Sequence, residues 1–195
     1  MATDAYMTFQ LYSGKGFLDA ESQVDFSNND ETLMTQPSAL TAGKVFEVED
    51  YSFDVEQTLN IGSQSSGAGA GKITFNAFSI TRKIDIASPT LFEMACAGTA
   101  FQSVTLALRK SVGASTDGGK EVSGRIFLRF DFKLVAVKTI SWSHDEESPK
   151  ETVTFEYGGM QIRYCKQDPN GKLGDPIPGG WNRIKNVRDQ SATAI

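Results

Sequence analysis

Apolar and polar residues alternate with a period of two along most of this chain, which is the pattern of strands that bury one face. The longest such run extends from Gly124 to Trp142. Along it we expect apolar side chains to face inward and charged side chains outward, namely Ile126, Leu128, Phe130, Phe132 and Leu134 against Arg129, Asp131 and Lys133. Shorter alternating runs cover residues 6–11, 45–57, 73–84, 104–108, 153–157 and 160–164. The pattern predicts a mainly β fold.

Interruptions of the alternation indicate bulges, a turn and one long loop. The phase slips near Glu49-Asp50 and again at Ala77-Phe78, as it does at a β-bulge. The sequence DPNG at 168–171 is a strong turn signal, because proline presets φ and glycine accepts positive φ. The polar stretch from Ser13 to Gly43 has no sustained periodicity, so we expect a long loop there, open to a short strand inside it.

One helix is predicted within this β pattern, from Ser88-Pro89 to Gly98. Ser88 supplies an N-cap hydroxyl, proline suits the first helical position, and Gly98 suits a left-handed C-cap. Apolar side chains surround the helix almost completely, with Leu91, Met94 and Ala95 in one stripe and Phe92 and Cys96 in a second. A helix of this kind is buried on more than one side, so we expect Leu91, Phe92, Met94 and Cys96 to be covered, in part by a neighbouring subunit.

A glycine-rich run, SQSSGAGAGK at 63–72, resembles a phosphate-binding loop at first sight. Such a loop needs a glycine at the position of Ser66, a serine or threonine at the position of Ile73, and a helix afterwards. The residues that follow alternate as a strand instead. We therefore interpret the run as a flexible connection between two strands, over residues 62–72.

The composition fits one soluble domain over residues 1–195. A chain of 195 residues with 39% hydrophobic residues can form one well-developed core. Its net charge of −5 argues against a nucleic-acid partner, which would need a basic surface. No apolar run is long enough to insert into a bilayer, and the N-terminal residues lack a secretory signal, so we expect synthesis in the cytoplasm. Two free thiols are expected at Cys96 and Cys165.

No set of residues predicts catalysis, a metal site or a cofactor. His144, the single histidine, lies in a charged segment typical of a solvated turn, and Cys96 lies on the apolar helix, where we expect a small core residue. Asp145, Glu146 and Glu147 lack the alternating pattern of a calcium loop. Trp181 is open to ligand stacking, but we expect it to anchor the last strand.

Two blocks of the sequence carry a family resemblance. They are FSITRKIDIASPTLFEMACAGTAFQSVTLALRKS at 78–111 and DPNGKLGDPIPGGWNRIKNV at 168–187. Both closely resemble the Hcp family (haemolysin-coregulated protein), the tube subunit of the bacterial type VI secretion system. The similarity runs from Phe46 to Val187, and the glycine-rich run, the helix entry and the closing Gly180-Trp181 fall in family order.

The resemblance implies a compact β-barrel of two antiparallel sheets with one flanking α-helix, related to phage tail tube proteins. It implies a homohexamer whose rings stack into a hollow tube that carries effector proteins out of the cell. A trimeric spike and a contractile sheath would be its further partners, and export would need no cleaved signal peptide. The implied protein is structural and not an enzyme.

Three groups of residues receive roles on this basis. The glycine-rich run would form the family's extended loop at subunit or ring-stacking contacts, through Ser63, Gln64, Ser65, Ser66, Gly67, Gly69, Gly71 and Lys72. Ser52 and Asp54 point away from the aromatic side chains of Tyr51 and Phe53, because neighbours on a strand alternate. By resemblance, their strand lines the channel, so Ser52 and Asp54 would face the lumen.

The loop at 16–43 departs from the family, in which the connection after the first strand is generally shorter. Two other classes of function stay open from the residues alone. A secreted ligand-binding β module would explain the barrel and the tryptophans, and a small hydrolase would need a catalytic set that the sequence does not display.

Overall fold

The computed structural model describes residues 3–12, 16–24, 26, 40–58, 73–110, 115–117, 120–122, 124–144, 148–168 and 173–189. Within these residues the chain forms antiparallel strands and one helix, α2 (Ser88–Ala97). The mainly β fold with two antiparallel layers and one flanking helix is therefore confirmed.

The first layer is the main path of a nine-stranded sheet, in the order β13-β12-β11-β10-β7-β1-β2. Its strands are β1 (Thr3–Gln10), β2 (Phe46–Val48), β7 (Ala100–Lys110), β10 (Arg125–His144), β11 (Pro149–Tyr164), β12 (Ile177–Asn182) and β13 (Val187–Arg188). In the second layer, β6 (Phe78–Lys83) pairs with residues 150–155 of β11, and β3 (Asp50–Ser52) pairs with β6. Two hairpins, β4 (Val55–Gln57) with β5 (Ile73–Phe75) and β8 (Ser115–Asp117) with β9 (Lys120–Val122), pair separately.

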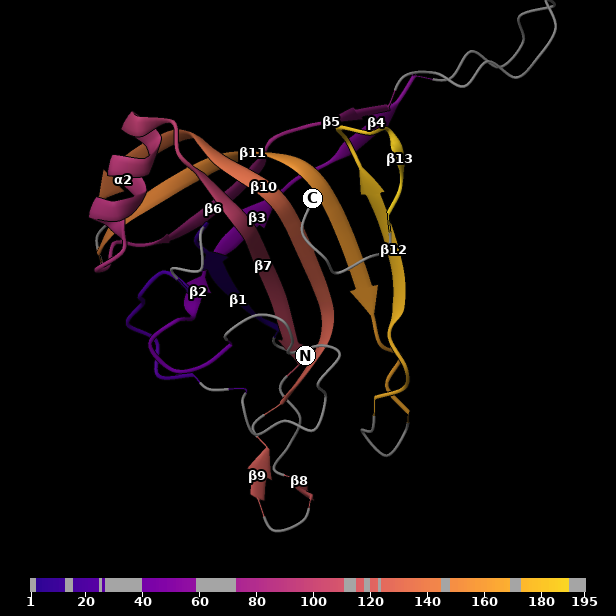
Figure 1. Ribbon diagram of the computed structural model, residues 1–195. Coiled ribbons are helices and arrows are strands. Elements are labelled where there is room, and N and C mark those ends of the chain that lie inside the picture. Colours follow the sequence, from indigo (N-terminus) through magenta and orange to yellow (C-terminus); the bar gives the residue numbers. More distant parts are fainter. Residues whose placement is uncertain are drawn as a thin grey trace, which may run out of the picture.

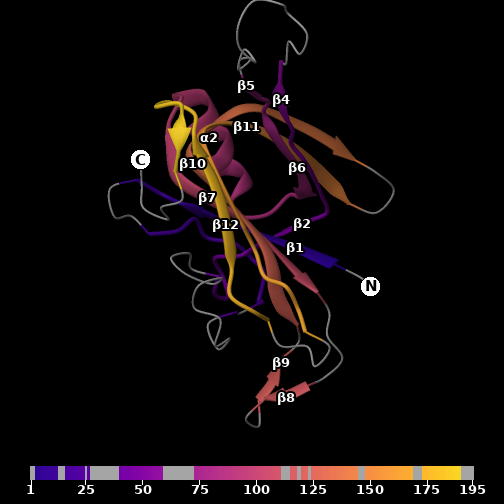
Figure 2. The same cartoon turned by 90° about the vertical axis from the view of Figure 1, so that its right-hand side faces the viewer.

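The long strands β10 and β11 belong to both layers, and they curve from one to the other (Figures 1 and 2). Residues 159–164 of β11 pair with β12 in the first layer, whereas residues 150–155 pair with β6 in the second. The helix α2 lies at the far end of these strands (Figure 1). Within the described strands, β2 and β13 are the two ends of the main path.

Phenylalanine rings fill the main core between the layers. Six of them are less than 2% exposed, namely Phe9, Phe46, Phe78, Phe101, Phe132 and Phe155. Phe78 stacks on Phe132 with ring centroids 4.4 Å apart. The predicted slips in alternation mark changes of partner, because the strand before Glu49 pairs with β1 and the strand after it with β6.

The alternation predicted for residues 153–157 of β11 is confirmed, because Val153, Phe155 and Tyr157 are buried. At residues 160–164 it is reversed, since Ile162 and Tyr164 are exposed and Gln161 and Arg163 are buried. β1 and β7 form strands as predicted, but both of their faces are buried.

The predicted orientation of β10 is wrong in three respects. Ile126 lies in the second buried cluster and not in the main core, and the register with β7 shifts between Ile126 and Leu128. Leu134 is 36% exposed and has φ +50, and Val135 takes the place in the core that the alternation assigned to Leu134. The charged residues Arg129, Asp131 and Lys133 were expected to face solvent but are only 1%, 6% and 6% exposed. They lie on the far face of the sheet, beside a second buried cluster formed by Tyr6, Phe26, Leu40, Val45, Ala107, Ile126 and Cys165.

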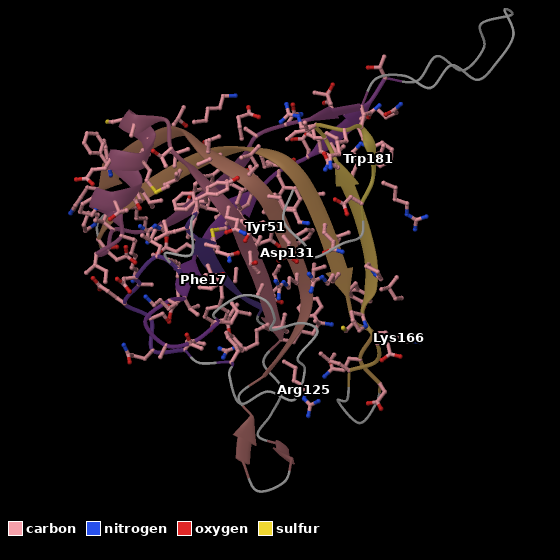
Figure 3. All side chains as sticks on the ribbon, viewed as in Figure 1. Phe17, Tyr51, Arg125, Asp131, Lys166 and Trp181 are labelled. Carbon is pink, nitrogen blue, oxygen red and sulfur yellow. The ribbon has the colours of Figure 1, made fainter. Side chains whose placement is uncertain are left out.

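The buried charges are compensated by one another. Asp131 accepts hydrogen bonds from the Arg129 guanidinium at 2.6 Å and from the Thr105 hydroxyl at 2.8 Å, and Arg163 lies 3.1 Å from its other oxygen. Figure 3 shows Asp131 near the middle of the strands. Burial of a charge is tolerated when it is paired and hydrogen-bonded. We call Thr105, Arg129, Asp131, Lys133, Gln161 and Arg163 the buried charge cluster.

The loop at 16–43 is only partly within the described residues. Phe17 bridges to Gln10, and Phe26 and Leu40 insert into the second cluster, where the Phe26 N–H donates to the Leu40 carbonyl at 2.8 Å. No helix or strand occurs in the described residues 16–24, 26 and 40–43 beyond that bridge. This loop covers part of the sheet that contains the buried charge cluster.

Candidate assembly surfaces

Ser52 and Asp54 are exposed, whereas Tyr51 and Phe53 between and beside them are half-buried. The Phe53 ring packs edge-on against Phe130 at 4.9 Å and Phe132 at 5.4 Å. The predicted alternation of these four residues is therefore confirmed. Whether Ser52 and Asp54 face a channel stays a prediction, because the structure contains one chain.

Asp54 lies in the connection between β3 and β4, where two hydrogen bonds from Asn76 hold it in place. The side-chain amide of Asn76 donates to its carboxylate at 2.6 Å, and the Asn76 backbone N–H donates to its carbonyl at 3.2 Å. These bonds connect the two segments that flank the β4–β5 hairpin. The carboxylate is thus held at a defined place on the exposed face.

The strands beside Ser52 extend this exposed polar face with short hydroxyl side chains. The register places Ser52 opposite Ser79, Ser79 opposite Thr154 and Thr154 opposite Thr139. A second row contains Thr81, Thr152 and Ser141, and the hydroxyls of Thr81 and Thr152 lie 3.2 Å apart. We call these seven residues the hydroxyl face. All seven are exposed or half-buried, and none is charged or large and apolar. The exposed carboxylate of Asp50, opposite Thr81, lies at the edge of this face.

The sequence analysis named only Ser52 from this face. The signal for the others was present, because serine or threonine alternates with core residues in three separate strands, at 79 and 81, 139 and 141, and 152 and 154. Pairing between those strands was needed to recognise a continuous surface, and one sequence does not give that pairing.

A buried ion network attaches α2 to the second layer. Arg82 and Glu151, which are 1% and 0% exposed, form an ion pair at 2.5 Å, and Arg82 also pairs with Asp85 at 2.8 Å. The Ser88 hydroxyl donates to Glu151 at 3.0 Å. The N-cap position is Ala87 rather than the predicted Ser88. The Ser88 hydroxyl instead accepts from the Asp85 N–H at 3.2 Å and belongs to this network. The predicted left-handed cap at Gly98 is confirmed, with φ 64.

The prediction that α2 is covered all round is wrong for the single chain. Leu91 is fully buried and Met94 half-buried, but Phe92 is 49% exposed and Cys96 is exposed. The Phe92 ring lies 6.0 Å from Trp142, which is itself 52% exposed. Only one side of α2 packs on the domain, so its second apolar stripe remains at the surface. Its burial by a neighbouring subunit stays a prediction.

The glycine-rich run at 63–72 lies outside the described residues, together with residues 59–62. The strands that precede and follow it, β4 and β5, pair antiparallel, with Gln57 opposite Ile73 and Val55 opposite Phe75. The predicted strand after the run is therefore confirmed, and the contact role of the run stays a prediction.

The remaining candidates are placed individually. His144 is exposed at the end of β10, and Asp145, Glu146 and Glu147 lie outside the described residues. Both cysteines are free as predicted, but Cys96 is exposed and not a core residue. Trp181 on β12 packs against the main core, as expected for an anchor of the last strands. Among the described residues, no three His, Cys, Asp or Glu side chains are grouped to hold a metal ion.

Comparison with known proteins gives one family and one fold. The family model described as "Type VI secretion system effector, Hcp" matches residues 40–164. A structure described as that of a type six secretion system protein has a TM-score of 0.68 and 24% identity, over 96% of this chain and 100% of that one. Hcp1 from Salmonella typhimurium has a TM-score of 0.64 and 21% identity, over 97% and 100%. Secreted protein Hcp3 from Pseudomonas aeruginosa has a TM-score of 0.56 and 15% identity, over 93% and 98%.

No curated protein sequence matches the chain. In the described part of the chain, no helix has the length and apolar character needed to cross a membrane.

Proposed function

The chain belongs to the Hcp family of type VI secretion proteins, and we propose that it is a structural tube subunit rather than an enzyme. In this proposal six copies form a ring, rings stack into a hollow tube, and the tube carries effector proteins out of the cell with a spike and a contractile sheath. The family match over residues 40–164 is the observation that carries the proposal. The chain would be made in the cytoplasm and exported without a cleaved signal.

The exposed stripe of α2 supports assembly into rings. Phe92 and Trp142, which are 49% and 52% exposed, lie side by side and form an apolar surface. Contiguous exposed apolar residues mark interaction surfaces on soluble proteins. A neighbouring copy in a closed ring would cover them.

The hydroxyl face supports a role as channel wall. Its side chains are short, uncharged and aligned across β3, β6, β11 and β10. Such a surface offers hydrogen bonds to many cargo proteins but little apolar area that would hold any of them tightly. We propose that this face, with Ser52 and Asp54, lines the lumen.

The glycine-rich run is proposed to contact the next ring. Its composition provides little apolar area, and its glycines raise the entropy cost of ordering, which a second ring would offset through backbone hydrogen bonds. Replacing residues 63–71 by a tight turn should therefore leave rings intact and shorten tubes. Tubes of normal length after the replacement would remove the run from the stacking mechanism.

Export tests the function directly. In the source bacterium, the tagged chain should appear in the medium when the sheath is intact and remain in the cells when the sheath gene is deleted. A matched cytoplasmic protein measured in the same samples controls for lysis. Equal release with and without the sheath would contradict the proposed function.

A further inference from the structure

A groove of about 440 Å³ opens beside β2 and the end of β6, next to the start of the loop at 16–43. Val45 and Phe46 lie beneath it but are 0% and 1% exposed, so its accessible apolar surface comes mainly from Ile84, which is 39% exposed. Glu21 reaches the groove from the loop, where it accepts a hydrogen bond from the Ile86 N–H at 3.1 Å. The groove therefore has a partly apolar floor at one edge of the main sheet.

The rim of this groove is acidic. Four carboxylates line it, those of Glu21, Glu47, Glu49 and Asp85, against the two cations Arg82 and Lys83. Arg82 is engaged by Asp85 and Glu151, and Glu49 pairs with Lys150 at 3.0 Å. Glu21 and Glu47 bind only uncharged donors within the described residues, the second accepting from the Ser22 hydroxyl at 3.0 Å. Within the described residues, these two carboxylates thus form no ion pair, although Lys83 lines the same groove.

A turn at the opposite edge of the sheet has the complementary character. It connects β12 to β13 and carries Arg183, Ile184 and Lys185, and Ile184 is 57% exposed. Asn182 is buried and holds the turn rigid, because its side-chain oxygen accepts from the N–H of Ile184 at 3.1 Å and of Lys185 at 2.9 Å. We call residues 183–185 the basic turn.

Lys185 is the cation of this turn that is available to a partner. Arg183 already binds Glu156 at 3.0 Å and the Tyr157 carbonyl at 3.2 Å. Lys185 has no carboxylate partner in the described part of the chain, and it stands next to the exposed Ile184. An apolar side chain beside a cation fits a groove with an apolar floor and an acidic rim.

The two surfaces lie at opposite ends of the strand order, the groove at β2 and the turn between β12 and β13. Figure 1 shows β2 and β12–β13 on opposite sides of the molecule, and Trp181, which Figure 3 labels, lies just before the turn. When two different surfaces of one chain are complementary, each copy can bind the next one head to tail. Such a series of copies closes into a ring if the rotation between neighbouring copies is a whole fraction of a turn.

We propose that the acidic groove of one copy receives the basic turn of the next copy, with Ile184 on the apolar floor and Lys185 beside Glu21 and Glu47. The inference rests on the proposed ring and names its contact. Charge pairing at a rim is screened by salt, so the contact should weaken as ionic strength rises.

A charge exchange tests the contact. Lys185→Glu and Glu47→Lys should each weaken assembly about tenfold or more, because each places like charges face to face. The double variant should recover a large part of the loss, because it restores an opposite pair. Asp175→Lys is the matched control, since it makes the same charge change on an exposed residue at the opposite end of β12 from the basic turn, and it should assemble like the natural chain.

Sedimentation at low and high salt measures the ring fraction, and circular dichroism confirms that each variant is folded. If Glu47→Lys does not fold, Glu21→Lys takes its place in the charge exchange. Rings that form equally in the natural chain and both single variants would overturn the contact and leave the proposed function standing. A double variant no better than the single variants would overturn it as well. A natural chain without rings would overturn the proposed function together with the contact.

Discussion

The two halves of β10 both carry polar side chains on the face turned away from the main core, yet their surroundings differ. In the near half, residues 125–136, which pair with β7, Arg129 and Asp131 are 1% and 6% exposed. In the far half, residues 137–144, Thr139 and Ser141 are exposed. The alternation of a strand indicates which face a residue takes, but it does not indicate what covers that face. The difference comes from residues distant in sequence, among them the loop residues Phe26 and Leu40 beside the near half.

The chemical type of these polar side chains differs between the covered half and the exposed half of the strand. Under cover, the polar residues carry charges that satisfy one another, as Asp131 does with Arg129 and Arg163. In the open, Thr139 and Ser141 carry short hydroxyls that water can solvate, and Lys138 forms an exposed ion pair with Glu156. We infer that the buried charge cluster contributes to the stability of the subunit, whereas the hydroxyl face contributes to its function.

Asp131→Ala gives the largest effect expected from this comparison. It removes the carboxylate that two buried guanidinium groups share, and an uncompensated buried charge costs about 3–5 kcal/mol of unfolding free energy. Urea denaturation measures the loss. The control Ser141→Ala on the same strand should change the unfolding free energy by less than about 0.5 kcal/mol, as exposed substitutions do. Equal effects of the two substitutions would remove the distinction between the two halves.

Tyr157 tests the junction between the two halves. It pairs with Val135 where the strands change layer, and its buried hydroxyl has no hydrogen-bond partner in the described chain. Burial raises the pKa of Tyr157 from 10.0 to about 12. The folded state therefore favours the neutral phenol, and this contribution is complete below pH 10 and is lost as the pH rises toward 12.

Tyr157→Phe should remove this loss, which reaches about 1.4 kcal/mol by pH 11, one unit above the ordinary pKa. At pH 7 the variant should be as stable as the natural chain or more stable, because it deletes a buried hydroxyl without a partner. Unfolding free energies measured from pH 7 to 11 compare the two proteins. A steeper decline in the variant than in the natural chain would show that the phenol does not carry the dependence.

Ser52→Gln should give the smallest change in stability and a clear change in function. Glutamine on the hydroxyl face alters the wall of the proposed lumen without disturbing the core, so retention of effectors should fall while rings persist. Thr99→Gln, which changes an exposed hydroxyl residue outside that face, is the control. Co-purification of an effector with each ring measures retention. Dissolution of the Ser52→Gln ring would assign Ser52 to packing instead.

The sequence predicted the strands, the helix and its Gly98 cap because local periodicity and capping determine them. The sequence-based predictions failed where contacts between distant segments determine which residues are buried. The positive φ of Leu134 shifts the alternation by one residue, and the loop at 16–43 has no periodic signal that would have indicated that Phe26 and Leu40 join the second buried cluster. The exposure of Phe92 and Cys96 was missed because a helix pattern shows which sides are apolar but not which of them the same chain covers.

The assembly surfaces were predictable only in part. Ser52 and Asp54 followed from alternation, but the hydroxyl face required the pairing of β3, β6, β11 and β10. The acidic groove combines residues from positions 21 to 85 that only the fold brings together. The basic turn could be recognised as a cluster of cations, whereas its position at the opposite edge of the sheet could not.

The mass of the natural chain in solution tests the central claim most directly. At micromolar concentration and low salt, native mass spectrometry with particle imaging should show closed rings of six subunits with an open centre, with a mass of six times 21.2 kDa. A clean monomer of 21.2 kDa under the same conditions would contradict the account.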